Sequence, residues 1–113
     1  MNKFIYIILF FIISCSGRIG TSITSEKITA EAILGNANYQ AICYGGYRTP
    51  SREIAPTVSE IKDDMRILAA MKIKVIRTYN VHHKEVAILL TAISELKKEQ
   101  SGFEMYVMLG AWI

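Results

Sequence analysis

Three short apolar segments recur along this chain at a nearly constant interval, with an amphipathic segment between each pair. They are centred near residues 43, 76 and 107, an interval of roughly 31–33 residues, which is the average length of one β/α unit in a closed (β/α)8 barrel. Strands joined by helical crossovers run parallel. The pattern therefore predicts an α/β fold: a partial (β/α)8 TIM barrel with its first three parallel strands and two helices. A flavodoxin-like open sheet has a similar interval and stays open as an alternative.

The segment after Pro56 carries the strongest helix signal. Thr57 is followed three residues later by Glu60, the spacing of a capping box in which each side chain binds the other residue's backbone N–H. Apolar residues then repeat at three- and four-residue spacing, which predicts one buried stripe. Asp63 and Asp64 lie on the helix surface and are interpreted as solvated charges. A second helix is predicted over residues 84–100, and a third strand over 103–109.

Composition excludes several classes of function. The chain has 113 residues, 51% of them hydrophobic, and a formal net charge of +3 with acidic and basic residues interspersed. The sequence has no basic stripe of the kind that binds nucleic acid, so we expect no nucleic-acid partner. Two cysteines cannot form a disulfide framework, and no Cys/His set has metal-finger spacing. We expect no metal and no cofactor, with His82 and His83 as loop residues and Cys43 as a small buried hydrophobe.

The first fifteen residues resemble a bacterial lipoprotein signal. Lys3 precedes an unbroken apolar run over residues 4–13, which is too short to span a membrane but long enough for a signal peptide. The run ends in Ile12-Ile13-Ser14-Cys15, which is similar to a lipobox, so Cys15 is the expected lipidation site and membrane anchor. Ser16 favours the outer membrane of the cell envelope. The domains expected are a signal peptide (1–15), a tether (16–38) with one helical turn near residues 29–34, and a barrel segment (39–113). An ordinary signal peptide, or a short anchor that is retained, stays open.

Candidate binding residues lie at the carboxyl ends of the predicted strands, where parallel α/β folds place their active sites. These residues are Tyr44, Arg77, Tyr79, Asn80 and Trp112. Aromatic rings flanked by hydrogen-bonding groups suit sugars, which present apolar C–H faces and many hydroxyls. The alternative is that the aromatic residues fill a barrel mouth because they are large and amphipathic.

Strand alternation assigns the second strand's side chains to two faces. If Tyr79 faces the barrel axis, Val75 and Arg77 do as well, whereas Ile76 and Thr78 face the helix layer. An inward arginine is costly unless it is paired. We therefore expect carboxylates near Arg77, unless that side chain lies at an edge and reaches solvent. Glycine at position 110 would allow a close approach to the third strand.

The stretch 41–113 resembles the N-terminal part of glycoside hydrolase family 17-type barrels, the β-1,3-glucanase relatives. The resemblance rests on Cys43-Tyr44-Gly45, Arg77-Thr78-Tyr79 and Gly110-Ala111-Trp112, in order and one β/α unit apart. It implies that Tyr44 and Tyr79 contact sugar, that Arg77 orients a carboxylate or donates to substrate, that Asn80 is a rim contact, and that Trp112 is a stacking platform.

The same resemblance implies a retaining hydrolase with two catalytic glutamates, at the ends of the fourth and seventh strands. Both positions lie beyond Ile113, so we expect no catalytic residue in this chain and no activity by the chain alone. The resemblance also places glycine where Lys72 stands, after the first helix. A side chain there is strained if the backbone is left-handed.

The expected function is that of the N-terminal part of an envelope-anchored glycoside hydrolase acting on β-1,3-glucan-type polysaccharide. Two alternatives stay open: a surface lipoprotein that binds glycan without cleaving it, and a different parallel α/β enzyme. The sequence does not specify an oligomeric state.

Overall fold

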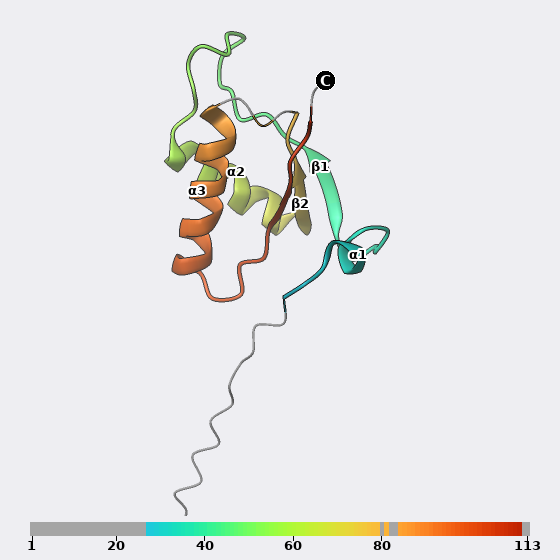
Figure 1. Cartoon of the computed structure of the whole chain (residues 1–113). Coiled ribbons are helices and arrows are strands. Elements are labelled where there is room, and N and C mark those ends of the chain that lie inside the picture. Colours follow the sequence, from blue (N-terminus) through green and yellow to red (C-terminus); the bar gives the residue numbers. More distant parts are fainter. Residues whose placement is uncertain (1–26, 80, 82–83, 112–113) are drawn as a thin grey trace, which may run out of the picture.

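The computed structural model describes residues 27–79, 81 and 84–111. Its elements, in chain order, are α1 (Ala30–Ile33), β1 (Gln40–Cys43), α2 (Val58–Ala70), β2 (Ile73–Arg77), α3 (Lys84–Glu99) and β3 (Tyr106–Met108). The three strands form one parallel sheet with β2 in the middle (Figure 1). This confirms the predicted α/β fold of a partial (β/α)8 barrel. The order β1-β2-β3 differs from a flavodoxin-like sheet, in which β1 separates β2 from β3.

Helices α2 and α3 cover one face of the sheet and enclose the core (Figure 1). Ile76 of β2 is fully buried between them, and the predicted stripe of α2 points inward through Ile61 and Met65. From α3 and the segment before β3, the buried side chains are Leu89, Ala92, Ile93, Leu96 and Met105. The core therefore lies on the side of the sheet that a barrel turns outward.

Both ends of α2 follow the sequence prediction. The capping box is present, because Thr57 accepts a hydrogen bond from the Glu60 backbone and Glu60 accepts one from the Thr57 backbone. The C-cap is Met71, and Lys72 after it has a φ of +67°. This left-handed conformation suits glycine and costs a residue with a Cβ roughly 1–2 kcal/mol.

Among residues 27–79, 81 and 84–111, the opposite face of the sheet is covered only near the amino ends of its strands. The single turn α1 lies against that part, where its Ile33 and Val75 of β2 line an apolar cavity of about 270 Å³. Val75 is 4% exposed. The Tyr39 ring meets the Tyr106 ring edge-on, with centroids 5.9 Å apart. The helical turn expected near residues 29–34 is thus present, and it lines one cavity together with strand residues.

Strand alternation holds, but one burial prediction is wrong. Ile76 faces the helices, whereas Val75 and Arg77 face the other side, as expected. Cys43 is exposed instead of buried, because β1 pairs with β2 alone and no described helix covers that end of its face. The β3 ladder is also shorter than the predicted strand: it spans residues 106–108.

Candidate functional site

The carboxyl ends of the three strands meet at one edge of the sheet, as parallel strands require. There the backbone N–H of Gly110 donates a hydrogen bond to Oγ1 of Thr78, at 3.0 Å. A Cβ at Gly110 would lie 2.1 Å from the Thr78 carbonyl oxygen and 2.8 Å from that of Tyr79. The close approach expected at Gly110 is therefore made by the backbone that follows β2.

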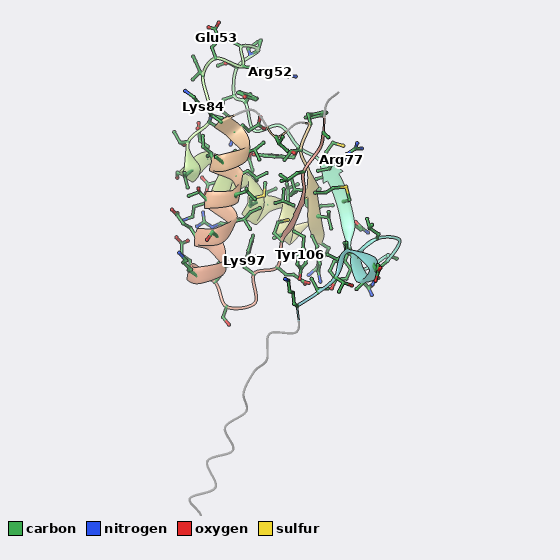
Figure 2. The ribbon with its side chains drawn as sticks, in the orientation of Figure 1. Arg52, Glu53, Arg77, Lys84, Lys97 and Tyr106 are labelled. Atoms are coloured by element: carbon green, nitrogen blue, oxygen red, sulfur yellow. The ribbon has the colours of Figure 1, made fainter. Side chains whose placement is uncertain are left out.

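Two of the predicted site residues lie at this edge. Arg77 is exposed on the face opposite the helices, in register with Cys43 and Met108, and forms no ion pair with another described side chain (Figure 2). Tyr79 is 56% exposed, and its ring lies 3.6 Å from where a Cβ of Gly45 would stand. Its ring therefore lies over the start of the loop after β1. Of the other predicted residues, Tyr44 is described and faces the helix layer, whereas Asn80, Trp112 and the lipidation candidate Cys15 fall outside the described residues.

Tyr44 faces the helix layer, packed against the core. Its hydroxyl donates to Oδ2 of Asp64, at 2.5 Å, and Nη2 of Arg48 lies 2.9 Å from the same oxygen. Burial and the Asp64 carboxylate raise the pKa of Tyr44 above its ordinary value. The interpretation of Asp64 as a solvated charge is therefore wrong: the loop folds back and gives it two partners. Contact of Tyr44 with sugar stays a prediction, beside this structural role.

Glu85 is a feature that sequence reasoning missed. It lies in the first turn of α3, yet it is 8% exposed. Its Oε1 accepts a hydrogen bond from the backbone N–H of Gly46 at 2.5 Å. Tyr47 lies near this carboxylate: burial, followed by the charge of Glu85, raises the pKa of Tyr47. An acid in a first helical turn is common, so the sequence carried no signal that this one is buried.

A cavity of about 260 Å³ opens between this loop and α3. It is lined by Gly45, Tyr47, Thr49, Pro50, Arg52, Tyr79, Glu85 and Val86. Figure 2 shows Arg52 on the loop that projects beyond the start of α3. Two phenol rings, a guanidinium and a buried carboxylate thus surround one small space. Such a set offers apolar surface together with donors and acceptors.

Other acidic residues of the described part have structural partners or lie in the open. Glu104 binds Nζ of Lys74 at 2.6 Å, at the amino end of the sheet. Glu95 and Glu99 both pair with Lys62 between α2 and α3. Glu53 lies exposed in the loop after β1. Within residues 27–79, 81 and 84–111, no three His, Cys, Asp or Glu side chains could hold a metal ion.

Comparisons with known proteins give one informative result. No protein-family model matches the chain, and no curated protein matches it significantly. Among solved structures, the chain is similar to an endo-laminarinase from Formosa Hel1_33_131, with 55% sequence identity and a TM-score of 0.74. The match covers 76% of this chain and 22% of the laminarinase chain. The strand order and helix layer described above are therefore shared with about a fifth of that enzyme.

Proposed function

We propose that this chain forms the first β/α units of a glycoside hydrolase that acts on β-1,3-glucan. The observation that carries the proposal is the 55% identity to an endo-laminarinase over 76% of the chain, with a TM-score of 0.74. An identity this high over most of the chain reflects shared side chains as well as a shared backbone. Membership of glycoside hydrolase family 17, suggested by the three strand-end motifs, is part of this proposal.

In this proposal the described residues bind substrate, and the bond-breaking carboxylates come from elsewhere in the barrel. Retaining hydrolysis needs two carboxyl groups about 5–5.5 Å apart, one as acid/base and one as nucleophile. At the carboxyl edge of the sheet, Glu85 accepts a hydrogen bond from the Gly46 backbone. Tyr79 would supply its exposed ring for stacking, and the exposed Arg77 would pair with a carboxylate or donate to a sugar hydroxyl.

We therefore expect this chain to bind a β-1,3-glucan without hydrolysing it. We expect laminarihexaose to bind, as measured by isothermal titration calorimetry, and cellohexaose to bind more weakly. Tyr79→Ala should weaken binding about three- to tenfold, the value of one aromatic contact. Tyr106→Ala is the matched control, because that ring lies at the opposite end of the sheet against Tyr39. Absence of laminarihexaose binding would contradict the proposal.

Reducing-sugar release from laminarin is the second measurement. The chain by itself should release no more than a buffer blank, because the proposal assigns neither catalytic carboxylate to it. Hydrolysis above the blank, abolished by a single Glu→Gln change in this chain, would show that the assignment is wrong.

We also propose that Cys15 is lipidated and anchors the protein to the cell envelope, with the outer membrane as its destination. The support is the Ile12-Ile13-Ser14-Cys15 sequence after a ten-residue apolar run. Within the described part, no helix is long and apolar enough to cross a membrane. Metabolic labelling with an alkyne fatty acid should mark the wild type and leave Cys15→Ser unmarked. Equal labelling of both would contradict the proposal.

A further inference from the structure

The buried carboxylate of Glu85 lines the cavity between the loop after β1 and α3 and lies outside the hydrophobic core. Burying a charged carboxylate is costly unless hydrogen bonds offset the lost hydration. The Gly46 backbone N–H supplies one such bond, and the Tyr47 phenol lies near the same carboxylate. A carboxylate has about four acceptor positions, so the bond from Gly46 leaves capacity for a ligand.

The loop that forms one wall of the cavity is fixed at several points. A Cβ at Gly46 would lie 2.3 Å from Cδ1 of Ile61 and 2.9 Å from the Tyr44 hydroxyl, so the loop backbone lies close against α2 there. Two residues further on, Arg48 is anchored by Asp64 at 2.9 Å. The cavity wall is thus formed before any ligand arrives, which lowers the entropic cost of binding.

The groups that line the cavity match the chemistry of a sugar. The rings of Tyr47 and Tyr79 offer apolar surface for the C–H face of a pyranose. Arg52 carries up to five N–H donors, and Glu85 accepts from hydroxyls. Arg52 also lies close enough to Tyr47 to lower that residue's pKa, against the larger effect of burial. A volume of about 260 Å³ suits one ring rather than an extended chain.

We propose that this cavity binds a single pyranose unit of a glucan, with Glu85 and Arg52 as its polar contacts and Tyr47 and Tyr79 as its aromatic walls. The inference rests on the proposed function for the identity of the glucan. The cavity lies between the loop after β1 and the start of α3. It is therefore separate from the sheet face that carries Arg77 and Met108, and it defines a rim subsite for one sugar at the side of that face.

Glycine amide signals offer a direct test, because the described glycines are spread over the molecule. Gly45 and Gly46 lie at the cavity, and Gly110 lies at the end of β3. Gly35 and Gly102 lie in turns away from it. We expect laminaritriose, titrated into the 15N-labelled full chain, to shift the Gly45 and Gly46 amides and to leave Gly35 and Gly102 in place.

Two variants test whether Arg52 and Glu85 contact the sugar. Arg52→Ala and Glu85→Gln should each weaken the response of Gly45 and Gly46 about tenfold, the loss of one charge-assisted hydrogen bond. Arg52 has no structural partner among the described residues, so its variant keeps the test valid if Glu85→Gln disturbs the loop. Glu53→Gln is the matched control, since Glu53 lies in the same loop but outside the cavity lining. Unchanged affinity in Arg52→Ala and Glu85→Gln would overturn the proposal.

The titration also separates this inference from the proposed function. If laminaritriose shifts Gly110 and leaves Gly45 and Gly46 in place, the rim subsite is wrong while glucan binding stands. If cellotriose or maltotriose shifts Gly45 and Gly46 and laminaritriose does not, the subsite stands and the β-1,3 specificity is wrong. If none of the three sugars shifts any glycine, both proposals are overturned.

Discussion

Replacing Lys72 by glycine should make the fold more stable, although it removes a side chain. Lys72 follows the C-cap of α2 with a φ of +67°. This conformation costs a residue with a Cβ roughly 1–2 kcal/mol. Glycine relieves that strain but gains freedom in the unfolded chain, which offsets about 0.4–1 kcal/mol. The net expectation is a gain of about 0.5–1 kcal/mol in the free energy of unfolding.

The assay is urea unfolding of the full chain, followed by far-UV circular dichroism at a concentration where the chain is monomeric. In thermal unfolding followed by the same signal, the melting temperature should rise by about 2–8 °C for a folded unit of this size. Lys72→Ala separates strain from charge, because it removes the ammonium and keeps the Cβ; it should change stability by less than about 0.5 kcal/mol.

Gly35 supplies the reverse control. Its φ is +76°, and a Cβ there would meet no atom within 4 Å. Gly35→Ala should therefore be destabilising by about 0.5–1 kcal/mol, from backbone strain alone. If Lys72→Gly is neutral or destabilising while Gly35→Ala lowers stability as expected, the account of α2's C-terminus is refuted.

Three further predictions concern contacts around the sheet. Tyr44→Phe removes the hydrogen bond to Asp64 and should lower the free energy of unfolding in urea by about 1–2 kcal/mol. Because the pKa of Tyr44 is raised in the folded state, the wild type should also lose stability above pH 10 more steeply than the variant. The Lys74 ammonium lowers the pKa of Glu104, so stability should fall as pH drops below about 4.5, and Lys74→Met should flatten that fall in acid titration. Gly110→Ala should destabilise the fold by about 1–3 kcal/mol, because its Cβ would overlap backbone oxygens that cannot move aside. A melting temperature equal to that of the wild type would contradict this, because it would show that the backbone at the end of β3 shifts to make room.

Local features of this fold were predictable because they depend on nearby residues. The capping box of α2 needs only Thr57 and Glu60, and both its hydrogen bonds are present. The strain at Lys72 was expected from the resemblance, which places glycine after this helix, and the φ of +67° confirms it. Strand spacing predicted the parallel α/β arrangement, because a crossover helix requires about thirty residues for each unit.

The candidate site was less predictable because its contacts join distant segments. Asp64 is paired because Tyr44 and Arg48 fold over α2. Glu85 is buried by a loop 39 residues earlier in the chain, through the backbone of Gly46. Helical periodicity gives the face on which each acid lies, but it does not tell which loop will cover that face. Cys43 was misassigned for the converse reason, since an apolar strand pattern assumes neighbours on both sides.

The most direct test of the proposed function is a chimera of the endo-laminarinase. Its matched segment, 22% of that chain, is replaced by the corresponding residues of this one, and laminarin hydrolysis is measured. If the chain forms the first β/α units of a β-1,3-glucan hydrolase, the chimera should release reducing sugar within about tenfold of the parent rate, a barrier change of about 1.4 kcal/mol. A chimera that folds with the parent's circular dichroism spectrum and yet releases no sugar would contradict it.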